Sequence, residues 1–264
     1  LEFGRATIKT LRAAFPVHAI EPRGPDDLSV PDIVENDAIR EIASDLACLR
    51  IYGQGSAISG TASEAQLLLS HERVLTSRNI MEPLPVCEVV ELWAATAGIA
   101  SLLYAACDRE DRLPGLVPSF LQCGASGVID LAWPVFDLVK ALVCERYGLV
   151  RWRLSLPPAE ALSQSVVWAQ RLIEDWAQSR AEHIGMRSAL LWIDQARRAG
   201  MIALGGNPVW VEPYAALSEY PLLREFSVDE LLTESRRPSH FAAFRYWGGI
   251  NRRADKDAEE SSEC

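Results

Sequence analysis

The sequence predicts an α/β fold with a mostly parallel sheet and helices on both faces. Short, continuous apolar runs bounded by turn residues recur along the chain, a pattern typical of strands buried on both faces. Between them lie stretches of helical periodicity that can form crossover helices. With 264 residues, 49% of them hydrophobic, the chain can bury a large core. We expect one domain over residues 4–250 and a charged, apolar-poor tail, 251–264, that should be disordered.

The N-terminal part is expected to alternate between helices and strands. Residues 6–14 have helical periodicity, which ends before Pro16 because proline cannot continue a helix. A short strand over 17–21 and a helix over 31–44 should follow. The apolar run 46–52 then predicts a buried strand that ends in a glycine-containing turn.

The middle of the chain repeats this alternation. Residues 63–80 suggest a hairpin-like excursion, with a short helix that starts at Thr76 or Ser77, where a hydroxyl can cap it. The further elements, in chain order, are a strand over 87–94, helices over 97–106 and 115–123, a strand over 126–133 and a helix over 135–147.

An apolar stripe predicts a long amphipathic helix in the last third of the chain. Its members are spaced four, three, four and three residues apart, so they share one face, which is expected to cover the sheet: Leu162, Val166, Ala169, Ile173 and Trp176. A second helix should carry Met186 and Leu190 and end near Gly200. Residues 201–235 are mixed in pattern, and 239–249 predict a closing strand.

Composition argues against several classes of function. The formal net charge is -10, and the arginine pairs at 197/198, 236/237 and 252/253 are short and scattered, so no nucleic-acid surface is expected. Six cysteines without a C-x-x-C pair argue against zinc and disulfide frameworks and favour a reduced, cytoplasmic setting. No apolar run approaches the roughly eighteen residues of a membrane span.

No motif for a cofactor, a metal or a serine nucleophile is complete. The segment "YGQGSAISG" offers Gly53 and Gly55, but the third glycine of a dinucleotide fingerprint would fall on Ile58. Phosphate-loop and nucleophile-elbow motifs are missing from the sequence, and none of the four histidines stands four residues from another. We therefore expect no cofactor and no metal. The chain opens on Leu-Glu-Phe without a methionine or a signal peptide, which favours a piece of a longer polypeptide.

Five segments resemble a known family. The segment "ACLRIYG" (47–53) stands where the family reads roughly "LHFACHG", "EAQLLLSHERVLTSRNI" (64–80) where it reads "SGLLLADGRLTAEDI", and "VVELWAATAG" (89–98) where it reads "LVVLSACETG". The segment "DRLPGLVPSFLQCGASGVIDLAWPVFD" (111–137) resembles "EVLGLARAFLAAGARSVVASLWPVDD", and "RPSHFAAFRYWGG" (237–249) resembles "HPYYWAAFVLIG". This order is similar to that of the CHAT domain of the caspase clan of peptidases. The resemblance covers nearly the whole chain and implies a caspase-like fold.

The resemblance also implies where a catalytic site would lie. In that family a histidine before the first glycine acts as general base and the cysteine of "ACETG" as nucleophile. By position, the base falls on Tyr52 and the nucleophile on Ala95. A methyl group cannot attack a carbonyl, and a phenol with a reference pKa of about 10 is a poor base near neutral pH. Gly53, whose amide would help line the oxyanion hole, is kept.

The leading hypothesis is a catalytically inactive CHAT-type pseudoprotease that serves as a protein-binding or regulatory module. The resemblance implies a bacterial multiprotein system, of a defence-related kind, in which the partner is another protein or another domain of the same polypeptide. Thr96 and Ala97 also depart from the family pattern, which favours natural loss of the site. The sequence predicts no particular partner and no oligomeric state.

Two other readings stay open at the level of sequence. The chain could be an active cysteine peptidase with a relocated nucleophile, Cys48 or Cys107, or with an engineered Cys-to-Ala change at position 95. It could also be a small-molecule sensor that uses the vacated pocket, to which Tyr52, Trp93, Ala95 and Asp137 would contribute. A thiol reagent and a thermal-shift screen, respectively, distinguish these readings from the first.

Overall fold

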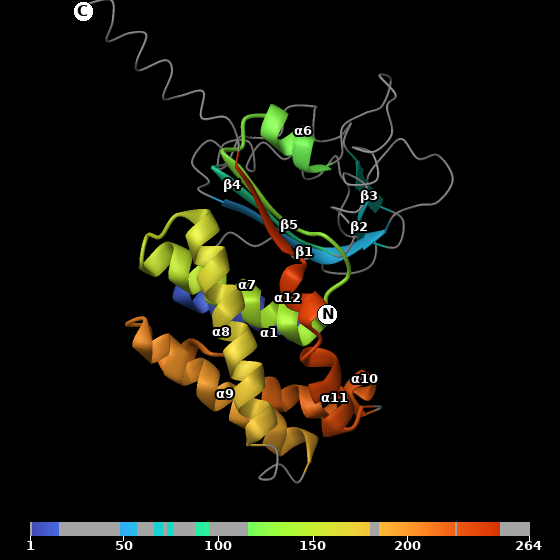
Figure 1. Cartoon of the computed structure of the whole chain (residues 1–264), viewed down its shortest axis with the longest axis vertical. Coiled ribbons are helices and arrows are strands. Elements are labelled where there is room, and N and C mark those ends of the chain that lie inside the picture. The colour runs from blue at the N-terminus through green and yellow to red at the C-terminus, as the bar shows by residue number, and fades with distance from the viewer. Residues whose placement is uncertain are drawn as a thin grey trace, which may run out of the picture. The chain divides into compact units, whose positions relative to one another are not determined.

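The computed structural model describes residues 2–15, 48–56, 66–70, 73–76, 88–94, 116–179, 185–224 and 226–248. The chain divides into two compact units (Figure 1). The helical unit comprises Leu1–Glu21 and Pro134–Phe244, and the sheet unit comprises Pro22–Trp133 and Arg245–Cys264. The expectation of one domain over 4–250 rested on the absence of a convincing linker, and it stays a prediction.

The sheet unit is built on a six-stranded sheet with the strand order β3-β2-β1-β4-β5-β6. Its strands are β1 (Cys48–Ser56), β2 (Gln66–Ser70), β3 (Arg73–Thr76), β4 (Val89–Ala94), β5 (Gly127–Leu131) and β6 (Phe244–Gly248). Strand β4 lies parallel to β1 and to β5, whereas β2 pairs antiparallel with both β1 and β3. The predicted α/β class with a mostly parallel sheet is therefore confirmed.

The central strands form where the sequence carries uninterrupted apolar runs. All six residues of β4 and all five of β5 are buried. Strands with both faces covered read as continuous apolar runs, because neither face alternates with water. Strands β4 and β5, the β2–β3 hairpin and helix α6 (Leu116–Gln122) confirm the predictions made for these segments.

Two strand boundaries differ from the predictions. Strand β1 continues through Gly53 and Gly55 to Ser56, because residues 54–56 pair with residues 66–68 of β2. The predicted glycine turn after Tyr52 is wrong, since these ladder contacts hold the glycines in strand conformation. The closing strand starts only at Phe244, because Pro238 at a helix N-terminus begins α12 (Pro238–Ala242).

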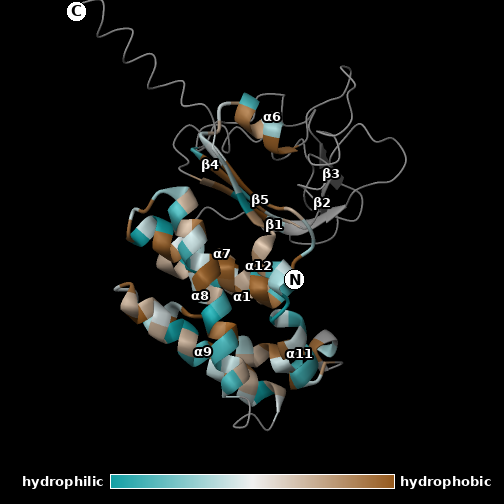
Figure 2. Ribbon diagram, in the orientation of Figure 1, coloured by the Kyte–Doolittle hydropathy of each residue, from teal (hydrophilic) through white to brown (hydrophobic). Residues whose placement is uncertain are grey.

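The helical unit consists of α1 (Glu2–Ala14), α7 (Asp137–Arg153), α8 (Pro158–Gln178), α9 (Met186–Ala203), α10 (Pro221–Arg224), α11 (Val228–Ser235) and α12, with the 3-10 helices η2 (Pro208–Trp210) and η3 (Tyr214–Glu219). Helix α7 is buried along nearly its whole length from Leu138 to Val150. Brown, hydrophobic residues accordingly gather on α7 in Figure 2. Burial on all of its sides places α7 inside the helical unit, and Lys140 and Glu145 are buried with its apolar residues.

The apolar stripe of α8 is confirmed as a helix face, with Leu162, Ala169, Ile173 and Trp176 buried. The sequence predicts that this stripe covers the sheet. In the structure α8 packs against α7, α9 and α11, which belong to the same helical unit. Periodicity predicts which face is buried but does not say what covers it.

Several predicted segments lie outside the described residues. These are the strand at 17–21, the helices at 31–44 and 97–106, the short helix from Thr76 or Ser77, and the tail 251–264. Among the helices that the structure describes, none combines the length and the apolar character needed to cross a membrane.

Candidate functional site

The position that the resemblance assigns to the base lies on β1, and the parallel strand β4 ends one residue before the position assigned to the nucleophile. Tyr52 on β1 is in register with Trp93 on β4, and Gly53 is in register with Ala94. Tyr52 is half-buried, and the nucleophile position, Ala95, follows β4 directly but lies outside the described residues. The structure thus places Tyr52, Gly53 and Trp93 on neighbouring strands, with Tyr52 within β1 and not at its end.

Trp93 contributes to packing. Its side chain is fully buried, and its indole Nε1 donates a hydrogen bond to Glu91 Oε2 at 2.8 Å. A ligand that stacks on this ring would first have to displace the residues that bury it. The geometry therefore gives no support to a stacking surface at Trp93.

Asp137, the other residue assigned to the vacated pocket, belongs to the helical unit, whereas Tyr52 and Trp93 belong to the sheet unit. It is the first residue of α7, and its Oδ1 lies 3.4 Å from Lys140 Nζ. An acidic side chain in the first turn interacts favourably with the helix dipole. In the structure, Asp137 therefore interacts with Lys140 and with the N-terminal end of its own helix.

A buried polar cluster in the same two strands was not predicted from the sequence. Glu91 is fully buried at the centre of β4, and Arg50 stands in register with it on β1. Arg50 donates from Nε to Glu91 Oε2 at 2.5 Å and from Nη2 to Oε1 at 3.1 Å. The sequence feature that could have indicated this cluster is a single charged residue at the centre of each apolar strand, Arg50 in "CLRIY" and Glu91 in "VVELWA".

Cys48 belongs to this cluster, because its Sγ donates to Glu91 Oε1 at 2.9 Å. A nucleophilic cysteine needs a thiolate, which cationic neighbours stabilise and anionic ones disfavour. Glu91 Oε1 accepts the hydrogen bond from the thiol, and Arg50 donates to the same carboxylate. A carboxylate is therefore in direct contact with Cys48 Sγ, which works against a thiolate.

Two further cysteines are described. Burial raises the pKa of the Cys123 thiol, which disfavours its thiolate, and Cys144 is fully buried in α7, where it interacts electrostatically with Lys140. His240 is the one histidine that the described residues include, and its Nδ1 accepts a hydrogen bond from the Phe136 amide at 3.4 Å. Burial lowers the pKa of His240, so this imidazole is neutral near pH 7. Cys107, the other candidate for a relocated nucleophile, lies outside the described residues.

A second buried carboxylate lies on the opposite face of the sheet from Glu91. Glu91 is in register with Ile129 of β5, so the next residue, Asp130, points to the other side. Asp130 accepts two hydrogen bonds from Arg245 and one from Trp247 Nε1 at 2.9 Å, both on β6. Burial raises the pKa of Asp130, whereas these donors work to lower it. Each carboxylate is therefore paired with an arginine and a tryptophan.

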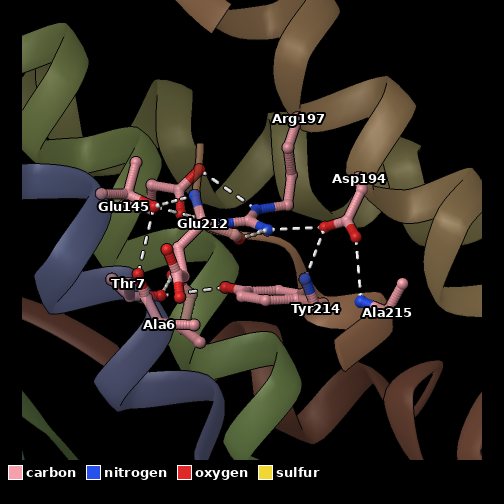
Figure 3. Close-up of polar contacts among 10 residues, drawn as sticks. Ala6, Thr7, Glu145, Asp194, Arg197, Glu212, Tyr214 and Ala215 are labelled. Atoms are coloured by element: carbon pink, nitrogen blue, oxygen red, sulfur yellow. Dashed lines mark hydrogen bonds and ion pairs between the residues drawn. The ribbon is translucent and has the colours of Figure 1, made fainter. Parts of the chain in front are cut away.

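The helical unit has its own buried cluster, centred on Arg197 of α9 (Figure 3). The guanidinium donates to Glu145 of α7 from Nε at 3.2 Å and from Nη2 at 2.5 Å, and from Nη1 to Asp194 Oδ1 at 2.8 Å. It also lies 3.5 Å from the centre of the Tyr214 ring. Burial works to lower the pKa of Arg197, but Glu145, Tyr214 and Asp194 together raise it above its usual value.

The same cluster fixes η3 and α1. Asp194 accepts hydrogen bonds from the amides of Tyr214 at 2.8 Å and Ala215 at 2.9 Å, at the start of η3. The Tyr214 hydroxyl lies 2.9 Å from Thr7 Oγ1 of α1, and burial raises the pKa of Tyr214 far above its usual value. Because every charged group is paired and buried, we assign this cluster a structural role.

Within the described parts of the chain, no group of three histidine, cysteine, aspartate or glutamate side chains is placed to hold a metal ion. What the geometry defines is a class: an α/β protein whose sheet carries two buried carboxylates, each bonded to an arginine and a tryptophan. Comparisons of the chain with protein-family models, with curated proteins and with solved structures found no match.

Proposed function

We propose that the chain is a catalytically inactive CHAT-type pseudoprotease that works as a protein-binding or regulatory module. The likeness to CHAT motifs and the mixed α/β sheet support the family assignment. One observation supports the loss of catalysis. Tyr52 stands at the position that the resemblance assigns to the general base, and it is in register with the buried Trp93. A tyrosine embedded in a strand pair cannot take the place of a histidine that activates a thiol.

The polar groups near this position support the same proposal. Cys48, Arg50 and Trp93 all donate to the buried carboxylate of Glu91. Buried polar groups joined in this way are typical of the hydrogen-bond networks that stabilise a core.

Complex formation tests the binding role. The chain would be mixed with each protein encoded beside its gene and separated by size-exclusion chromatography with mass detection. We expect a stable complex with at least one of them, in which the partner stays intact on a denaturing gel. If no mixture gives a complex, the binding role is wrong, and if a partner is cut, the inactive role is wrong.

The alternative of a relocated nucleophile is tested by thiol labelling. A reactive low-pKa cysteine reacts with iodoacetamide well below pH 8, whereas a buried thiol reacts only after unfolding. We expect Cys144, which is buried, to be labelled only in denaturant, and the partly exposed Cys48 and Cys123 to react slowly in the native protein at pH 7. Fast native labelling of Cys48 at pH 7 that is abolished by Cys48→Ala would support the active-peptidase alternative instead.

A further inference from the structure

Helix α1 belongs to the helical unit but is separated in sequence from the rest of that unit by the sheet unit. The helical unit consists of Leu1–Glu21 and Pro134–Phe244, and Pro22–Trp133 belongs to the sheet unit. Thr7 of α1 lies against α7, where its Oγ1 donates to the Ala141 carbonyl at 3.4 Å across 134 residues of sequence. Packing, and not a short connection along the chain, therefore holds α1 in the helical unit.

One face of α1 is buried against α7, η2 and η3. The buried residues of α1 with a side chain recur at the spacing of a single helix face: Phe3, Ala6, Thr7, Thr10 and Leu11. A helix that packs by one such face onto a partner is a recurrent mode of recognition between proteins. We call the surface that receives α1 the α1 docking surface, and we define it by Ala141 of α7, Arg197 of α9, Glu212 after η2 and Tyr214 of η3.

The α1 docking surface contacts hydroxyl groups of α1 as well as apolar side chains. The Tyr214 hydroxyl lies 2.9 Å from Thr7 Oγ1 (Figure 3), and the Tyr214 ring meets the Phe3 ring edge-on at 5.0 Å between centres. Thr10 Oγ1 accepts a hydrogen bond from the Glu212 amide at 3.0 Å. A helix that docks here therefore needs an aromatic side chain and two hydroxyls at fixed positions of one face.

The polar framework of the α1 docking surface does not depend on α1. Arg197 donates to Glu145 from Nε and Nη2, and to Asp194 from Nη1. All three nitrogens of this guanidinium therefore keep a partner outside α1. The Tyr214 hydroxyl and the Glu212 amide would lose their partners on α1, but α1 also covers them, so water can replace those partners when α1 leaves.

Helix α1 buries few large apolar side chains. Phe3 and Leu11 are buried and Ile8 is half-buried, whereas α7 is buried along nearly its whole length from Leu138 to Val150. Gly4 and the two threonines favour the helical state less than alanine does, and a helix of 13 residues is marginal on its own in water. Elements with few buried apolar contacts open without global unfolding. Helix α1 can therefore leave and re-enter its place while the rest of the unit stays folded.

We propose that α1 is an exchangeable helix, and that the α1 docking surface of one copy of the chain accepts the α1 of a second copy. The second copy carries the same aromatic, hydroxyl and apolar pattern that the surface contacts in the structure. Exchange of an identical element reproduces the existing contacts in the dimer and requires no new interface. Each copy has a net charge of -10, but charges more than about 8 Å apart are largely screened at physiological ionic strength.

Capture between two tagged copies tests this exchange. Full chains with different C-terminal tags would be mixed at high concentration and captured through one tag. We expect the second tag to be recovered, in a species that has the mass of a dimer by size-exclusion chromatography with mass detection. An excess of a synthetic peptide of residues 1–15 should abolish this recovery. The same peptide with Phe3→Ala and Leu11→Ala should not, because it lacks both large apolar anchors.

The same two substitutions in the chain weaken its own α1 and leave the docking surface unchanged. The Phe3→Ala/Leu11→Ala chain should bind the labelled wild-type peptide at least tenfold more tightly than the wild-type chain does, because its own helix occupies the surface less. Fluorescence anisotropy measures this difference. The matched control is Val167→Ala on α8, an exposed valine outside the docking surface, which should bind the peptide as the wild type does.

Three results would overturn the exchange of α1. The first is that no second copy is recovered, and the second is that the alanine peptide competes as well as the wild-type peptide. The third is that the folded double-alanine chain binds the peptide no better than the Val167→Ala control. Melting curves show whether the double-alanine chain is folded, and if it is not, the two peptides on the wild-type chain decide. A dimer that neither peptide disrupts would place the association on another surface and overturn the proposal as well.

Discussion

Arg197 lies at the centre of the buried polar cluster of the helical unit. It joins α9 to α7 through Glu145 and contacts Asp194, which in turn holds the start of η3. The Arg197–Glu145 pair spans 52 residues of sequence. Helical periodicity predicts that both positions are buried, but it does not indicate which buried residues contact one another. The sequence therefore predicted the helices and not this cluster.

Replacing Arg197 with methionine should destabilise the protein strongly. The change leaves Glu145 and Asp194 buried without their cation, which typically costs about 3–5 kcal/mol. Arg197→Lys should recover little, because an ammonium group cannot make the forked contacts of a guanidinium. Urea unfolding measures the loss, and the neighbouring Arg198→Met should change the unfolding free energy by less than about 1 kcal/mol. Equal losses for the two methionine variants would contradict this assignment.

His240 should make stability depend on pH. Its folded-state pKa is lowered, chiefly by burial, with Glu234 raising it and Arg237 lowering it to smaller extents. The unfolded chain therefore binds this proton more readily than the folded one, so stability is highest above the unfolded pKa of about 6.5 and falls as the pH drops through it.

The comparison of wild type with His240→Asn isolates this effect, since the other three histidines are present in both proteins. Asparagine keeps an acceptor for the Phe136 amide but does not titrate. Melting temperatures between pH 8 and pH 5 should fall more for the wild type than for the variant. Parallel curves would show that His240 contributes nothing to the pH dependence.

At the scale of elements, the sequence predicted the apolar runs well and the polar interior poorly. Strands β4 and β5 and helices α6 to α9 follow directly from apolar pattern. Strand β1 ran past its predicted end because its partner β2, more than ten residues away, supplies the ladder for residues 54–56. The alignment of Arg50 with Glu91 depends on the strand register, which a single sequence does not specify.

A double-mutant cycle on β1 and β4 tests the Arg50–Glu91 pair. Arg50→Met alone leaves the buried Glu91 charge without its cation and should cost about 3 kcal/mol. The double variant Arg50→Met/Glu91→Leu removes both charges and should be more stable than Arg50→Met alone. Denaturant unfolding should give a coupling of about 1–3 kcal/mol. Additivity within about 0.5 kcal/mol would show that the strands do not depend on this pair.

At the scale of the whole molecule, the protein consists of a sheet unit and a helical unit, each with its own buried charge clusters. The sheet unit holds the positions at which a CHAT peptidase would carry out catalysis. Residue types alone predicted that these positions are inert, because a methyl group and a phenol replace a thiol and an imidazole. That Cys48 and Arg50 both donate hydrogen bonds to Glu91 could be found only from the folded arrangement.

The most direct test of the central claim is a cleavage assay on a proteome-derived peptide library, read by mass spectrometry. The wild-type chain, Cys48→Ala and Cys107→Ala would be incubated with the library in parallel at pH 7. The account predicts no new peptide termini with any of the three. Reproducible cleavage by the wild type that disappears in either cysteine variant would contradict the pseudoprotease assignment and identify the nucleophile.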